Sequence, residues 1–189
     1  MKENFYTLME NNPVIAAVKD SNGLAACTTC GEAEIIFILY GDICSIGKIV
    51  ETVKAAGKTA IVHVDLVDGL MGKETSVEFI KEFTMADGII STKPLLIKKA
   101  KELGMYSVLR IFILDSMSFE NIRRQLKIVR PDALEILPGV MPKIIQKVNK
   151  IAKVPIIAGG LISEKEDVIA ALSAGAICAS TTNETVWNV

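Results

Sequence analysis

Eight short apolar runs divide the sequence at intervals of roughly 21 to 27 residues, about the length of one strand followed by one helix. The runs are rich in Val, Ile and Leu without polar alternation, as in parallel strands that are buried on both faces. The segments between them carry helical apolar spacing or residues that start and stop helices. We therefore expect parallel strands at residues 14–18, 35–39, 59–66, 87–91, 106–114 and 133–137, with a seventh from Pro155 and an eighth from Ala176.

This repeated pattern predicts a compact (β/α)8 TIM-like barrel with short loops, formed by a single domain over residues 1–189. The alternative is an open doubly wound sheet, for which eight regular units without a split would be unusual. Helices are expected between successive strands, at residues 21–27, 45–57, 75–83, 94–104, 116–130, 142–153 and 163–174.

Composition and cysteine spacing exclude several classes of protein. No apolar run approaches the roughly 18 residues of a membrane span, and the first residues, Met1 to Asn4, carry an acid and no apolar signal core. We therefore expect a cytoplasmic protein with no membrane partner. The pair Cys27-x-x-Cys30 resembles a redox or metal motif but lacks the second pair of ligands that a zinc site needs. We expect reduced thiols, no metal and no cofactor.

The last two junctions between strand and loop form the strongest candidate binding site. The seventh strand ends in Gly159 and Gly160, and the eighth in Thr181, Thr182 and Asn183. Glycine lets a backbone approach a ligand closely, and hydroxyl and amide groups hydrogen-bond phosphate oxygens. When a barrel of this kind binds a phosphate, the site is usually formed by the loops after strands seven and eight. We therefore expect these residues to bind a phosphate group. A plain turn at the glycine pair is the alternative.

Four further polar residues are expected at the C-terminal ends of inner strands, where barrels bind ligands. They are His63, Asp65, Arg110 and Glu135, and together they would suit the polyol end of a small phosphorylated ligand. Two structural alternatives stay open: His63 as a core residue, and Arg110 paired with Glu135. If the barrel is instead an enzyme, Asp65 or Glu135 would be its general base.

The net charge of −1 conceals a strongly uneven distribution. From Lys93 to Lys153 the sequence holds 13 Lys and Arg against 5 Asp and Glu. Many of these cations belong to three consecutive expected helices, which would be neighbours on the outside of a barrel. Such a surface predicts a polyanion partner, although surface lysines are often merely solvated. The residues assigned to this contact are Lys98, Lys99, Arg123, Arg124, Lys127, Lys143 and Lys147.

Several short motifs, taken in order, resemble those of the glycerol-3-phosphate-responsive antiterminator family, the glycerol uptake operon antiterminators. The resemblance runs from about Pro13 to Trp187. The motifs are Val62-His63-Val64-Asp65-Leu66, Gly88-Ile89-Ile90-Ser91-Thr92, Arg110-x-Phe112-Ile113-Leu114-Asp115, Glu135-Ile136-Leu137-Pro138-Gly139, Ile157-Ala158-Gly159-Gly160-Leu161-Ile162 and Thr181-Thr182-Asn183.

The resemblance implies a regulator without a catalytic residue. Such a protein binds glycerol 3-phosphate as an effector and acts on leader mRNA of glycerol-utilisation genes, so that transcription continues past a terminator. A homo-oligomer is compatible with this expectation. The alternative from a different class is a barrel enzyme that acts on a triose or sugar phosphate, because the fold alone does not settle the function.

Overall fold

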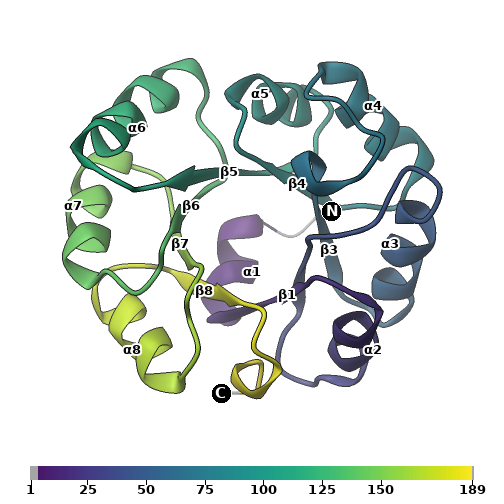
Figure 1. Cartoon of the computed structure of the whole chain (residues 1–189), viewed down its shortest axis with the longest axis horizontal. Helices are drawn as coiled ribbons and strands as arrows, with labels where there is room; N and C mark the ends of the chain where they lie inside the picture. The colour runs from purple at the N-terminus through teal and green to yellow at the C-terminus, as the bar shows by residue number, and fades with distance from the viewer. Residues whose placement is uncertain (1–3, 189) are drawn as a thin grey trace.

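The computed structural model describes residues 4–188 and consists of a closed barrel of eight parallel strands surrounded by helices (Figure 1). Each strand pairs with the next, and β8 pairs with β1. The predicted (β/α)8 barrel is thereby confirmed. The strands are β1 (Val14–Val18), β2 (Ile35–Ile38), β3 (Thr59–His63), β4 (Gly88–Ser91), β5 (Tyr106–Phe112), β6 (Ala133–Leu137), β7 (Ile156–Gly159) and β8 (Cys178–Thr181). The helices are α1 (Phe5–Asn11), α2 (Ser21–Thr29), α3 (Ile46–Ala55), α4 (Glu74–Phe83), α5 (Pro94–Glu102), α6 (Ser116–Ile128), α7 (Pro142–Ala152) and α8 (Lys165–Ser173), with 3-10 turns at Val64–Leu66 and Glu184–Val186.

Two hydrophobic layers hold the barrel together, one inside the strands and one between the strands and the helices. Ile15, Phe37, Ile61 and Ile157 belong to the inner layer and are fully buried. Their sequence neighbours on each strand pack outward against the helices. Both faces of each strand are therefore apolar, which explains why the strands read as continuous hydrophobic runs in the sequence.

The first helix, α1, is not among the predicted elements, and it closes the N-terminal end of the barrel. Its Phe5, Leu8 and Met9 are buried and join the inner hydrophobic layer. The ring of Phe5 stacks on Tyr106 at the start of β5, with 4.6 Å between the ring centroids. In Figure 1, α1 lies within the ring of strands rather than among the outer helices. Within residues 4–188, α1 therefore covers the N-terminal end of the barrel interior.

Strands β3 and β5 end two or three residues earlier than the sequence suggested. Strand β3 ends at His63 rather than Leu66, because the chain turns there into the 3-10 helix Val64–Leu66. The carboxylate of Asp65 in that turn accepts hydrogen bonds from the Thr92 N–H and the Ser91 hydroxyl. Strand β5 ends at Phe112, so the predicted last residues of that run lie in the loop before α6.

The expected helix starts after β1 and β5 are present. Asp20 caps α2 by accepting a hydrogen bond from the Gly23 N–H, and Asp115 caps α6 by accepting one from the Ser118 N–H.

Within residues 4–188, no helix combines the length and apolar character that a membrane crossing requires.

Candidate functional site at the mouth of the barrel

A cavity of about 500 Å³ opens at the C-terminal end of the barrel, beside the ends of β1, β5, β7 and β8. This mouth cavity combines one cation with backbone and hydroxyl groups from two adjacent loops. Its lining includes Arg110, Gly160, Ser163, Ser180, Thr182 and Asn183, with Ala17, Leu39 and Leu161 among the apolar members. The structure thus brings Arg110 together with the residues predicted to bind phosphate.

The loop after β7 depends on its two glycines for different reasons. Gly160 has a positive φ of 75°, a backbone conformation that favours glycine, and its carbonyl accepts a hydrogen bond from the Gly139 N–H at 3.0 Å. Gly159 has no room for a side chain, because a Cβ there would collide with Glu135 and Ser180. Gly160 lines the mouth cavity, whereas Gly159 makes space for the polar groups beneath it.

The three polar residues after β8 differ in how their side chains are used. The Thr181 hydroxyl donates to the Ile162 carbonyl at 2.6 Å, and the Asn183 amide donates to the Ser163 carbonyl at 2.8 Å. These bonds join the loops after β7 and β8 to each other. Thr182 is exposed in the mouth cavity, and no hydrogen bond of its hydroxyl is recorded within residues 4–188. The Thr182 hydroxyl is therefore available to a ligand, whereas the other two side chains already bind the backbone of the loop after β7.

A buried polar network lies at the floor of the mouth cavity. The Arg110 Nε–H donates to Oε2 of Glu135 at 2.5 Å, and the Ser180 hydroxyl donates to Oε1 at 2.6 Å. Glu135 is fully buried, so both of its oxygens find partners inside the barrel. The pairing of Arg110 with Glu135, which the sequence left open as a structural alternative, is therefore present. Ser180 lies on the same face of β8 as the buried Cys178.

His63 lies inside the barrel, on the same face of β3 as Ile61, and is 3% exposed. Burial, together with the positive charge of Arg110, lowers the pKa of its imidazole to about 4, despite the opposing effect of Asp65. The ring is therefore neutral at physiological pH. Its Nδ1 has no hydrogen-bond partner within residues 4–188, and it lies 4.0 Å from Oδ2 of Asp65.

Asp65 is held by the end of the neighbouring strand. Besides the bonds from Ser91 and Thr92, its Oδ1 lies 3.3 Å from the ammonium of Lys93. Burial alone would raise the pKa of this carboxyl, but the hydrogen bonds from Thr92 and Ser91 hold the pKa below its usual value. Asp65 and His63 thus form a second polar group beside the mouth cavity, and neither of them lines it.

Comparison with known proteins identifies the family. The family model described as glycerol-3-phosphate responsive antiterminator matches residues 14–187. This chain belongs to the glycerol-3-phosphate-responsive antiterminator family. The match covers the barrel strands and the loops after β7 and β8 that line the mouth cavity, so the resemblance seen in the sequence motifs is confirmed.

Three individual proteins are similar to this chain over nearly its whole length. An Escherichia coli K12 protein, YgcP, described as uncharacterized, is 47% identical over 182 residues, which cover 96% of this chain and 95% of YgcP. The glycerol uptake operon antiterminator regulatory protein of Listeria monocytogenes has a crystal structure with a TM-score of 0.90, at 31% identity over 94% of this chain and 95% of its own. The crystal structure of the glycerol uptake operon antiterminator-related protein of Thermotoga maritima has a TM-score of 0.83. It is also 31% identical, over 94% of this chain and 99% of the Thermotoga chain.

The basic residues of this antiterminator family member fall into two groups. On α5, Lys99 lies 2.6 Å from Glu78, and Lys98 lies 4.0 Å from Glu102. The basic residues of α6, α7 and the loops that follow them form no ion pair within residues 4–188. The surface predicted from the charge count is therefore neutralised in part on α5 and unpaired on α6 and α7. The unpaired and exposed members are Arg123, Arg124, Lys127, Arg130, Lys143, Lys147, Lys150 and Lys153.

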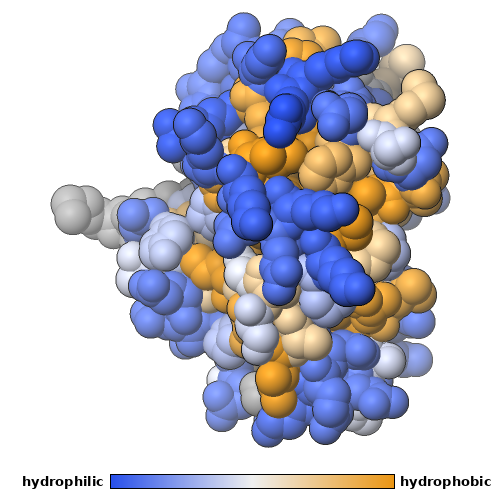
Figure 2. All heavy atoms as spheres, turned by 90° about the vertical axis from the view of Figure 1, so that its left-hand side faces the viewer, coloured by the Kyte–Doolittle hydropathy of each residue, from blue (hydrophilic) through white to orange (hydrophobic). Residues whose placement is uncertain are grey.

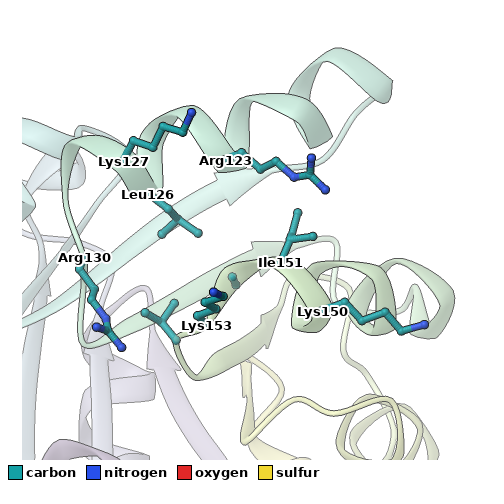
Figure 3. A pocket seen from close by; sticks show the side chains of 9 residues that line it. Arg123, Leu126, Lys127, Arg130, Lys150, Ile151 and Lys153 are labelled. Atoms are coloured by element: carbon teal, nitrogen blue, oxygen red, sulfur yellow. The ribbon is translucent and has the colours of Figure 1, made fainter.

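A groove of about 480 Å³ separates α6 from α7, and these unpaired cations line much of it (Figure 3). Leu126 and Ile151 face each other across the groove, while Arg123, Lys127 and Lys150 extend from its edges. Figure 2, which looks onto α6, α7 and α8, shows the same alternation of hydrophilic side chains with hydrophobic patches. The groove lies on the outer surface, away from the mouth cavity.

The cysteines form no disulfide and no metal centre within residues 4–188. Cys27 is buried, its thiol donates to the Leu24 carbonyl, and burial raises the pKa of this thiol to about 11. Cys30 donates instead to the side chain of Asn188. Cys30 therefore connects the end of α2 with the C-terminal segment, whereas the bond of Cys27 stays within α2.

Proposed function

We propose that this chain is a glycerol-3-phosphate-responsive antiterminator that binds leader mRNA and regulates glycerol uptake and utilisation genes in the cytoplasm. The observation that carries the proposal is the match of the family model over residues 14–187, on a chain whose mouth cavity has the size and polarity for one small phosphorylated polyol. The Listeria monocytogenes relative, a glycerol uptake operon antiterminator regulatory protein, supports the same assignment.

The effector would bind with its phosphate against the loops after β7 and β8. Gly160 offers a backbone surface without a side chain, and Thr182 offers a free hydroxyl. Arg110, which also lines the cavity, supplies the positive charge that a phosphate dianion or a polarised hydroxyl requires. Asn183 and Thr181 would act by holding these loops in place rather than by contacting the phosphate through their side chains.

The polyol end would lie toward the second polar group of the barrel. His63 is neutral, so its ring can exchange hydrogen bonds with a hydroxyl without introducing a charge. Asp65 and Glu135 remain ionic groups that orient their neighbours Lys93 and Arg110. Because Arg110 lines the mouth cavity and Glu135 does not, Glu135 would act by fixing the direction of the charge that the cavity presents.

Leader mRNA would bind to the unpaired cations of α6 and α7. Cations without acidic partners create a positive electrostatic potential at the protein surface, and this potential attracts the phosphates of RNA over a long range. Lys98 and Lys99 of α5 would contribute less, because Glu102 and Glu78 already offset their charges. Effector and RNA would thus occupy different parts of the molecule, as a ligand-controlled regulator requires.

A catalytic role is the less favoured alternative. Both oxygens of Glu135 accept hydrogen bonds inside the protein. Oδ2 of Asp65 accepts hydrogen bonds from Ser91 and Thr92, and its Oδ1, which accepts no hydrogen bond within residues 4–188, lies 3.3 Å from the ammonium of Lys93. A general base needs a free oxygen within reach of the substrate proton. The engagement of both candidate bases supports a binding site over a proton-transfer site.

A gel-shift experiment on leader RNA of a glycerol-utilisation operon tests the proposal. We expect the purified chain to shift the RNA and the shift to depend on added glycerol 3-phosphate. A parallel assay with triose and sugar phosphates should detect no turnover. RNA binding that is indifferent to glycerol 3-phosphate, or substrate turnover at an enzymatic rate, would contradict the assignment.

A further inference from the structure

Three hollows meet around Lys153 and Val154 at the N-terminal end of the barrel, opposite the mouth cavity. The first is the groove between α6 and α7. The second and third, each about 470 Å³, extend from the same two residues to Tyr6 on α1. Arg130 lines both the first and the third hollow. A continuous depression, here called the basal track, therefore runs from the side of the barrel around to its closed end.

The basal track is strongly cationic. Arg123, Lys127, Arg130, Lys150 and Lys153 are all exposed along it, and none belongs to an ion pair recorded for residues 4–188. The acid that lines the track, Asp132, is already bound by Lys101 at 2.8 Å and by Ser107. Uncompensated cations in a concave surface favour a polyanion over a small neutral ligand.

Lys153, where the hollows meet, has an unusual backbone. It ends α7 in the left-handed conformation, with φ 51° and ψ 23°. This conformation is commonly held by glycine at helix ends and is unfavourable for a residue with a side chain. The chain turns here into β7, and Lys153 is exposed and lines all three hollows.

Aromatic and apolar groups accompany the charges. Tyr6 is 48% exposed and lines two of the three hollows. Its neighbour Phe5 is buried and stacked on Tyr106, which anchors this part of α1. No ring stacks on Tyr6 among the residues that the structure describes. At the other end of the track, Leu126 and Ile151 form an apolar floor.

We propose that the basal track binds single-stranded RNA, with phosphates on its cations and a base stacked on Tyr6. This inference rests on the proposed RNA-binding function and adds the strandedness, the path and the stacking residue. Exposed rings beside cations are the usual platform for unpaired bases. A duplex is stiff and buries its bases, so it would neither follow a track around the barrel end nor use Tyr6 or the apolar floor.

Fluorescence anisotropy with the full chain tests this proposal. The probes are a labelled RNA of about 16 nucleotides and mixed sequence, within the usual range for single-strand sites, and the same strand annealed to its complement. We expect the single strand to bind at least tenfold more tightly than the duplex. Tyr6→Ala should weaken single-strand binding about tenfold, the loss typical of one stacked base, while Tyr6→Phe should retain it. Lys153→Glu should weaken it as well.

Controls separate this inference from the proposed function. Lys165→Glu reverses an exposed charge on α8, off the track, and should leave binding unchanged. Equal binding of single strand and duplex, or parental affinity in Tyr6→Ala, would overturn the basal track while leaving antitermination intact. Absence of binding to both probes, together with absence of binding to leader RNA, would overturn both.

Discussion

Arg110 and Glu135 occupy paired positions on the adjacent strands β5 and β6, and their side chains meet at 2.5 Å between Nε and Oε2 inside the barrel. The pair is buried, and the Ser180 hydroxyl donates a hydrogen bond to the second oxygen of the carboxylate. Arg110 also lines the mouth cavity, so the same ion pair belongs to the barrel core and to the candidate effector site.

Because a buried charge needs its partner, removing either side of this pair should be costly. We expect Arg110→Met and Glu135→Leu each to lower the free energy of unfolding by about 3 kcal/mol. The double variant should be more stable than the sum of the two losses predicts, since it leaves no unpaired ion. Urea denaturation of the four proteins provides the measurement. Strict additivity would mean that the contact contributes nothing.

The double variant should also bind glycerol 3-phosphate poorly.

His63 should make stability depend on pH in the mildly acidic range. Its pKa is near 6.5 in an unfolded chain and about 4 in the folded barrel, so the unfolded state takes up a proton first as the pH falls. The stabilising contribution is complete above pH 6.5 and is lost as the pH falls toward 4, a change of about 3 kcal/mol. In His63→Gln this slope should be flatter between pH 6.5 and 4.5. A variant with the parental slope would contradict the assignment.

Two neighbouring threonines should behave oppositely. Thr182→Val removes an exposed hydroxyl of the mouth cavity and should weaken glycerol 3-phosphate binding about tenfold with little change in stability. Thr181→Val removes the donor to the Ile162 carbonyl and should cost about 1–3 kcal/mol of stability. Calorimetric titration and thermal unfolding of both variants separate the roles. If Thr181→Val loses affinity without losing stability, its hydroxyl contacts the effector after all.

The charge pattern on α6 supports a further variant. Changing Arg123, Arg124 and Lys127 to Glu should abolish binding to leader RNA and leave the affinity for glycerol 3-phosphate unchanged, because these side chains are exposed and lie away from the mouth cavity. The matched control is Lys98→Glu with Lys99→Glu, where Glu102 and Glu78 already offset the charges. This control should lose less affinity. If the triple variant binds the RNA as tightly as the parent at moderate salt, these cations are only solvated.

The strands were predictable because both of their faces are buried. A run such as Ile35–Ile38 has no polar position to obscure it, and the regular spacing of eight such runs leaves few alternatives to a barrel. The helix α1 was not predictable in the same way. It has seven residues, and its function as a plug arises from the contact of Phe5, Leu8 and Met9 with strands that are distant in the sequence.

The candidate site was predicted by position rather than by side-chain direction. The sequence placed Thr181, Thr182 and Asn183 at the end of one strand, but which of them faces the cavity depends on the register of β8 with β7 and β1. The end of β3 is a similar case. Asp65 leaves the strand because Ser91 and Thr92, 26 and 27 residues later in the chain, bind its carboxylate. Such contacts cannot be read from local pattern.

Calorimetric titration of glycerol 3-phosphate tests the central claim most directly. The parent should bind one molecule, and Gly160→Val should abolish binding, because its side chain would enter the space between Leu137 and the mouth cavity. The control is Gly57→Val, which replaces another glycine with φ +75° at a position where nothing lies within 4 Å. It imposes the same backbone strain away from the site and should bind like the parent. Equal affinity in all three proteins, or no binding by the parent, would contradict an effector site at the mouth of this barrel.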